Sequence, residues 1–202
     1  GVPWATAGAN GIGVDRDDLP LDSKTMTSAG VWYDFDITDL ARLWVTTPAQ
    51  NHGVALKTTG NGQVEYELWS SDYEFAPIVR PKLTIVYETS IVGPTPTRTP
   101  TRTATISPTP TRTNTPAPAT ITFQRGVAPD AGYVGVYDTF ISNFGDTTAN
   151  YGISPTLELR ANDTRAALLR FDLSSLPPTA NIVSAEMSVH VDYKTNDFTM
   201  PV

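Results

Sequence analysis

The sequence predicts an all-β protein of two arms joined by a long spacer. Polar and apolar residues alternate with period two in several segments, the pattern of half-buried strands. Only one short segment shows helical spacing of apolar residues. Residues 93–120 read GPTPTRTPTRTATISPTPTRTNTPAPAT, with eleven Thr and seven Pro among 28 residues. This composition separates an arm at 1–92 from an arm at 121–202.

The first arm contains four predicted strands, and their bounds are 31–37, 54–57, 64–68 and 81–87. In the first of them Tyr33, Phe35 and Ile37 share one face, while the aspartates between them lie on the other. Gly60-Asn61-Gly62 is a hairpin signal, so we expect the second and third strands to pair with each other.

One short helix is expected after the first strand. Thr38-Asp39 offers an N-cap. The apolar residues that follow have helical spacing and are Leu40, Leu43 and Trp44. Pro48 is expected to end this helix.

The second arm contains four further predicted strands, and their bounds are 133–141, 156–160, 166–171 and 182–193. The last has the longest period-two pattern of the chain. The side chains expected to face inward are Val183, Ala185, Met187, Val189 and Val191.

The spacer has almost no apolar surface, so burial cannot offset the entropy of folding it into a core. Proline fixes φ and removes N–H donors, so we expect an extended, polyproline-II-like linker. Thr/Ser-rich sequence with Pro is typical of O-glycosylated stalks, which are extracellular. The candidate O-glycosylation sites are Thr95, Thr97, Thr99, Thr101, Thr103, Thr105, Ser107, Thr109, Thr111, Thr113 and Thr115. Asn162 begins an Asn-Asp-Thr sequence, a candidate N-glycosylation site.

Charge and composition exclude several classes of partner. The first arm carries 12 acidic and 6 basic residues and the second 9 and 5, whereas nucleic-acid binding needs a basic surface. The chain has no cysteine, and therefore no disulfide and no zinc–thiolate site. No apolar run approaches the roughly 20 residues of a membrane-spanning helix. The first residues, GVPWATAG, do not resemble a secretory leader, so we expect a mature fragment or an excised repeat.

No catalytic site is expected. The only histidines, His52 and His190, lie in different arms, and no nucleophile stands in a recognisable motif such as G-x-S-x-G. Acidic pairs occur on every β surface, so they do not by themselves indicate a glycosidase.

An acidic stretch near the start of the chain is a candidate calcium site. Asp15, Asp17 and Asp18 are close together in a loop, and Ca²⁺ takes six to eight oxygen ligands from such loops. The Gly and Glu positions of an EF-hand are missing, so the alternative is a solvated acidic loop.

Three aromatic residues in polar surroundings are candidates for stacking on sugars. They are Trp4, Trp69 and Tyr73, the last two within the sequence WSSDYEF. Aromatic faces pack on apolar sugar surfaces, and neighbouring polar groups orient the ligand. The alternative is a structural role for these rings. Trp32 and Trp44 are expected in the core.

Both arms resemble the DNRLRE domain, which is also classed among carbohydrate-binding modules. Segments 138–141, 150–152, 165–177 and 182–185 resemble its beginning, and 32–38 with Trp44, 51–56 and 80–87 resemble its end. The resemblance implies jelly-roll-like antiparallel β-sandwiches and a role in carbohydrate binding. The order within this chain is reversed, because the end of a domain precedes the spacer and the beginning of a domain follows it.

Two hypotheses follow from this order. Neither arm alone completes a sandwich, and the last strand of the second arm is left with an open edge. If each arm completes the sandwich of a neighbouring chain, the protein is a non-catalytic extracellular glycoprotein that assembles with itself into a surface filament. The alternative is a carbohydrate-binding region of a larger secreted polysaccharide-active enzyme or adhesin.

Overall fold

A computed structural model describes most of the chain. The described residues are 5, 11–17, 19–59, 64–89, 117–143, 145, 148–162, 164–195 and, as backbone only, 198–201. The spacer up to residue 116 and the expected turn at 60–62 lie outside these residues.

Strands dominate the described residues, which confirms the all-β class predicted from the sequence. The elements are β1 (Ser23–Met26), β2 (Trp32–Asp36), α1 (Thr38–Thr46), η1 (Pro48–Gln50), β3 (Val54–Leu56), β4 (Glu65–Trp69), η2 (Pro77–Val79), β5 (Lys82–Thr89), β6 (Ala119–Gln124), β7 (Val136–Ser142), β8 (Thr156–Arg160), β9 (Arg165–Phe171), β10 (Ala180–Lys194) and β11 (Phe198–Pro201).

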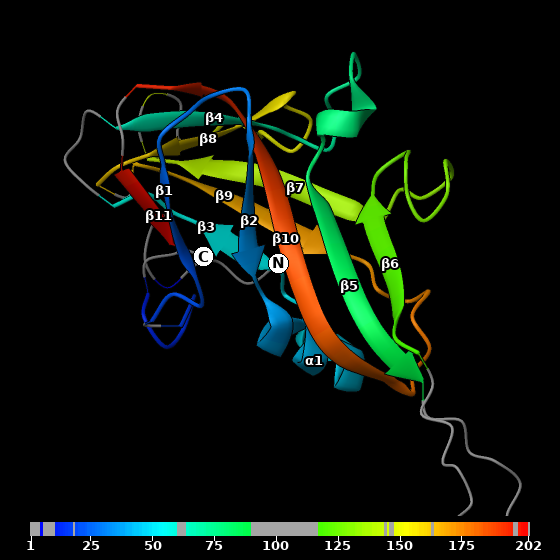
Figure 1. The fold of residues 1–202 in the computed structure, drawn as a ribbon. Helices are drawn as coiled ribbons and strands as arrows, with labels where there is room; N and C mark the ends of the chain where they lie inside the picture. Colours follow the sequence, from blue (N-terminus) through cyan, green and yellow to red (C-terminus); the bar gives the residue numbers. More distant parts are fainter. Residues whose placement is uncertain are drawn as a thin grey trace, which may run out of the picture.

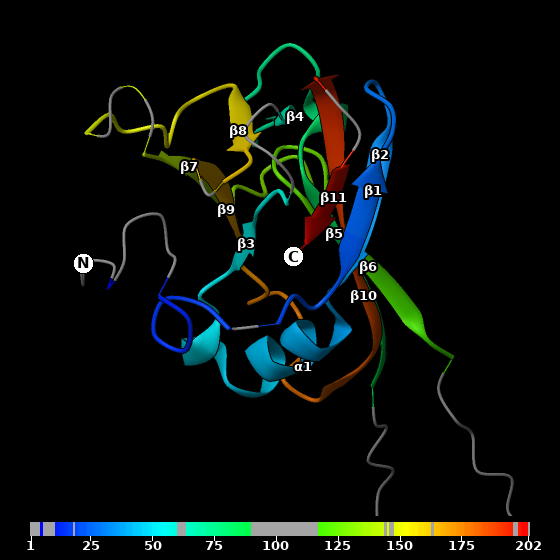
Figure 2. The same ribbon diagram turned by 90° about the vertical axis from the view of Figure 1, so that its left-hand side faces the viewer.

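Nine strands form one curled antiparallel sheet. Their hydrogen-bonded order is β3-β9-β8-β4-β10-β5-β6, and in addition β2 pairs with β10 and β7 with β9. Because the sheet curls, β2, β10, β5 and β6 form one layer, and β3, β9, β7, β8 and β4 lie opposite them (Figure 1 and Figure 2). Strands β1 and β11 pair separately, and α1 lies at one end of the two layers (Figure 2).

Strand β10 joins the two arms within one chain. Its residues pair with β5 from Ala180 to Ser188, with β2 from Glu186 to His190, and with β4 from Val191 onward. All three partners belong to the first arm. The edge of this strand that was expected to be open is therefore covered by the same chain.

The spacer connects two neighbouring strands. β5 and β6 pair antiparallel from Lys82 opposite Gln124 to Tyr87 opposite Ala119. The end of the first arm and the start of the second are thus adjacent in the sheet, and β6 begins within the range expected for the spacer.

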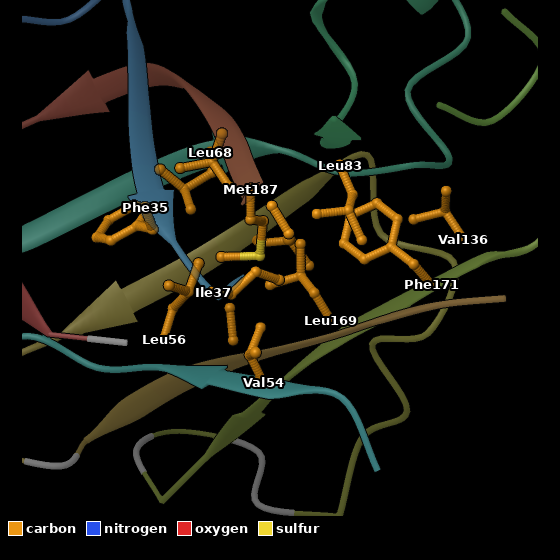
Figure 3. Packing of buried hydrophobic residues seen from close by; sticks show 14 of the residues in the cluster. Phe35, Ile37, Val54, Leu56, Leu68, Leu83, Val136, Leu169, Phe171 and Met187 are labelled. Atoms are coloured by element: carbon orange, nitrogen blue, oxygen red, sulfur yellow. The ribbon is translucent and has the colours of Figure 1, made fainter. Parts of the chain in front are cut away.

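The hydrophobic core lies between the two layers and draws on both arms. Figure 3 shows Met187 of β10 between Phe35 and Leu83 of the first arm, with Leu169 and Phe171 of β9 nearby. Met187 and Phe35 are fully buried. Neither arm buries its apolar face without the other.

The inward-facing set of β10 differs from the prediction at its start. The pairing with β5 shifts between Ile182 and Ser184, which leaves Val183 as the extra residue of a bulge. Ile182 is 3% exposed and Val183 is 44% exposed. The prediction was wrong for Val183, because a bulge inverts the face on which the following residues lie.

The strands on either side of Gly60-Asn61-Gly62 do not pair with each other in the described part of the chain. β3 pairs with β9, and β4 pairs with β8 and β10. The two strands lie on different parts of the curled sheet, so the prediction that they pair with each other was wrong.

Helix α1 forms where expected, but its contacts differ. The Thr38 hydroxyl donates to Asp36 Oδ1 (2.5 Å) and accepts the N–H of Ala185 (3.0 Å), so it ties the helix to β10 and makes no helix cap. Trp44 is buried as expected, whereas Leu43 is 38% exposed.

The bulge in β10 makes two neighbouring substitutions unequal. Ile182→Ala should lower the free energy of unfolding by about 2–4 kcal/mol, because it leaves a cavity in the core. Val183→Ala, the control, should change it by less than about 0.5 kcal/mol. Urea denaturation measures both. A larger loss for Val183→Ala would show that β10 has the regular register.

Candidate functional site

Three aromatic rings gather at the end of β4 and in the loop that follows it, where Trp69 and Tyr73 are half-buried and Phe75 is exposed. Trp69 and Tyr73 stack with ring centroids 3.8 Å apart and planes at 20°. Phe75 lies 5.9 Å from Tyr73 at 55°, and its side chain is 91% exposed. We call Trp69, Tyr73 and Phe75 the aromatic group.

The backbone of this loop is held by two buried serines. The Ser70 N–H donates to Pro155 O (3.0 Å) and the Ser70 hydroxyl to Ser154 O (2.5 Å). The Tyr73 N–H donates to Ser70 O (3.3 Å), and this hydrogen bond closes a turn. Ser70 and Ser71 are buried, so the rings project from a fixed base.

A polar network anchors the same loop to the strands of the second arm. The Ser71 N–H donates to Asp138 Oδ2 on β7 (2.7 Å), and Arg125 Nη1 donates to Asp72 Oδ1 (2.6 Å). Arg80 Nε donates to Tyr73 O (2.8 Å), and Arg80 Nη1 donates to Arg125 O (2.9 Å). The position of the aromatic group therefore depends on both arms.

Burial, together with the nearby charge of Asp72, raises the pKa of the Asp138 carboxyl to about 6. The hydrogen bond from the Ser71 N–H opposes this rise. Asp138 thus titrates in a mildly acidic range while it supports the loop.

A second surface group lies on the outer face of β2, β10 and β5. Trp32 and His190 stand opposite each other, with ring centroids 5.3 Å apart at 85°. Lys82 Nζ lies 4.3 Å from the Trp32 ring centroid. The expectation that Trp32 is a core residue was wrong, because it shares the outer face of β2 with Asp34. The lysine covers part of its ring.

The structure brings together two of the three aromatic residues suggested by the sequence. Trp69 and Tyr73 stack on each other, whereas Trp4 lies outside the described residues. Phe75 was not singled out, although it belongs to the same WSSDYEF sequence. Its exposure follows from the turn at Ser70, which periodicity does not predict.

The candidate calcium ligands are only partly described, because Asp18 lies outside the described residues. Asp15 Oδ1 accepts the Ala5 N–H (2.8 Å) and Asp15 Oδ2 accepts the Gly11 N–H (3.0 Å). Asp17 is exposed. Within the described part of the chain, no three His, Asp or Glu side chains gather as metal ligands. The calcium site stays a prediction.

The glycosylation sites also stay predictions. The spacer residues from Thr95 to Thr115 lie outside the described residues. Asn162 is exposed and adopts φ of 60° in the turn between β8 and β9. The hydroxyl of Thr164, the third residue of the sequon, donates to Ala161 O (2.8 Å).

The second arm is similar to a family of carbohydrate-binding modules. The model of carbohydrate-binding module family 96 matches residues 131–201, about one third of the chain. No curated protein and no solved structure matches the chain. The match supports carbohydrate binding and agrees with a binding module that has no catalytic activity. None of the described helices is long and apolar enough to cross a membrane.

The raised pKa of Asp138 predicts a pH-dependent stability. The folded protein holds this proton more tightly than the unfolded chain, so the stability due to the protonated form is lost as pH rises from about 4 to about 6. Asp138→Asn keeps an acceptor for the Ser71 N–H and does not ionise. Relative to wild type, its Tm should therefore rise between pH 4.5 and pH 7.5.

Thermal melts at several pH values measure this difference. The matched control is Asp34→Asn, which replaces an exposed carboxylate on β2. A Tm difference between Asp138→Asn and wild type that stays constant with pH would contradict the assignment.

Proposed function

We propose that this protein is a non-catalytic carbohydrate-binding domain that binds polysaccharide through the aromatic group. The observation that carries the proposal is the stacked Trp69–Tyr73 pair next to the almost fully exposed Phe75. Large apolar side chains are costly to expose and are typical of interaction sites when they gather on a surface. The family match over the second arm supports the same class of ligand.

The chemistry of the loop fits a sugar ligand. Flat aromatic faces pack against the C–H-rich faces of sugar rings, and neighbouring polar groups fix their orientation. The rings stand on a base held by Ser70, Asp138 and Arg80, so little entropy is lost when a ligand orders them.

Two carboxylates that contact the loop have a structural role there. Asp72 pairs with Arg125, and Asp138 accepts the Ser71 N–H. Both therefore hold the loop in place, whereas a glycosidase needs two carboxyl groups that flank the scissile bond.

The cellular setting is part of the proposal. The Thr/Pro-rich spacer and the binding-module match support an extracellular protein with O-linked sugars on the spacer, as part of a larger secreted enzyme or adhesin. The filament hypothesis depended on an open edge of the last long strand, and β10 is paired on both edges within the chain. That pairing removes its main support.

Substitutions in the aromatic group test the proposal. Affinity electrophoresis in gels that contain soluble polysaccharides should show retardation of the wild-type protein by at least one polymer. Phe75→Ala and Tyr73→Ala should each weaken this affinity roughly tenfold, which corresponds to about 1.4 kcal/mol. Phe75 is almost fully exposed, so its removal should leave Tm unchanged.

Trp32→Ala is the matched control, because it removes an aromatic ring from another surface. It should leave the affinity unchanged. If Trp32→Ala abolished binding while Phe75→Ala did not, the site would lie on the outer face of the β2–β10–β5 layer. If no polysaccharide retarded the wild-type protein, the proposed function would be wrong.

A further inference from the structure

A cavity lies between the connection from β6 to β7 and the segment that follows β9. Its volume is about 250 Å³, below the roughly 300–1,000 Å³ of pockets that hold drug-sized ligands. The side chains that matter for the argument are Asp130, Tyr133, Tyr137, Asp172, Ser174 and Ser175. We call this cavity the tyrosine pocket.

The frame of the tyrosine pocket is already formed without a ligand. The Tyr133 hydroxyl lies 3.0 Å from both Gly135 O and Asp172 O. The Asp172 N–H donates to Gly135 O (2.7 Å), and the Gly126 N–H donates to Tyr133 O (2.8 Å). Burial raises the pKa of the Tyr133 phenol, so the hydroxyl keeps its proton and its role as a donor.

Gly135 lets the Tyr133 ring and the backbone at Asp172 approach each other closely. A Cβ at this position would lie 2.8 Å from Asp172 Cβ and 2.8 Å from a ring carbon of Tyr133. Any larger residue would push the two walls apart. The close packing therefore fixes the positions of the groups around the cavity.

Hydrogen-bond acceptors remain available at the pocket. Asp130 Oδ1 accepts the Gly132 N–H (2.7 Å), and Asp172 Oδ1 accepts the Ser174 N–H (2.9 Å). Within the described part of the chain, the second oxygen of each carboxylate has no hydrogen-bond partner. Two oriented carboxylates match the hydroxyl donors of a sugar, and bonds to ionised acceptors are the stronger ones.

An exposed ring borders the same cavity. Tyr137 is 57% exposed, and the Arg170 guanidinium lies 5.6 Å from its ring centroid. A ring beside oriented carboxylates combines the two contacts that sugar recognition uses, stacking and hydrogen bonding.

We infer that the tyrosine pocket binds a single neutral sugar unit, separately from the aromatic group. The inference rests on the proposed function and adds to it a second site and a ligand preference. A uronic acid is disfavoured because its carboxylate would lie near Asp130 and Asp172, whose two negative charges outnumber the one positive charge of Arg170 beside Tyr137. Two like charges about 4 Å apart in water cost roughly 1 kcal/mol, which is about fivefold in affinity.

Titration of the full chain with monosaccharide glycosides tests the inference. The probes are the methyl glycosides of glucose, galactose and mannose, with those of glucuronic and galacturonic acid for comparison, followed by NMR. At least one neutral glycoside should bind with saturable shifts. Its uronic acid counterpart should bind at least fivefold more weakly.

Two variants locate the binding. Tyr137→Ala removes the ring, and Asp130→Asn keeps an acceptor for the Gly132 N–H while removing the charge. Each should weaken binding of the neutral glycoside at least fivefold. Asp130→Asn should also reduce the difference in affinity between the neutral glycoside and its uronic acid counterpart. Trp32→Ala is the matched control, because it removes an aromatic ring from the outer face of the β2–β10–β5 layer, and it should leave monosaccharide binding unchanged.

The outcomes separate this inference from the proposed function. Equal binding of neutral and acidic glycosides, no effect of Tyr137→Ala, or no monosaccharide binding would overturn the tyrosine pocket as a site. Polysaccharide binding that depends on Phe75 would persist in each of these cases. If the wild-type protein bound the neutral glycoside but no polysaccharide, the proposed role of the aromatic group would instead be wrong.

Discussion

The pairing of β10 with three strands of the first arm is the interaction on which the rest of the structure depends. Its 15 residues span Ala180–Lys194 and bond to β5, β2 and β4. Strand pairing and burial coincide here, because Met187 stands opposite both Phe35 and Leu83. Without β10 the apolar faces of both arms would be exposed to water, which costs about 25 cal/mol of free energy for each Å² of apolar surface.

The candidate site depends on the same junction. Trp69 ends β4 of the first arm and Tyr73 lies in the loop that follows, but Asp138 and Arg125 of the second arm hold this loop. These contacts join residues 67 and 53 positions apart in sequence. A binding surface built across both arms is expected to form only in the complete sandwich.

Much of the fold could be predicted from alternation, which reports the face of a strand. It predicted β8 with its bounds and the shared face of Phe35 and Ile37, which are both buried. Alternation does not report which strands pair, so the prediction that β3 and β4 pair with each other was wrong. It cannot detect a bulge either, and Val183 was therefore assigned to the wrong face. β1, β6 and β11 are short strands or strand ends with weak patterns and were not predicted.

The site could be predicted only where local composition is unusual. Trp69 and Tyr73 stand among serines and an aspartate, so a surface position was expected for both, and both rings are half-buried at the end of β4 and in the loop after it. The contact of Asp138 with the loop joins distant segments of the chain, and so does the tyrosine pocket. No local sequence pattern reveals either of them. The reversed order of the two halves stays a prediction from the resemblance, because the family model matches residues 131–201. That both halves meet within one chain depends on the pairing of β5 with β6 and β10.

The central claim is that the two arms of a single chain complete one sandwich. Thr84 on β5 and Glu186 on β10 stand directly opposite each other, and the chain has no cysteine of its own. Facing residues of an antiparallel pair lie within the 4.4–6.8 Å Cα separation that a disulfide spans. After oxidation of the Thr84→Cys/Glu186→Cys double variant, a non-reducing gel should show a cross-linked monomer at every protein concentration. A ladder of covalent oligomers would show instead that each arm completes the sandwich of a neighbouring chain.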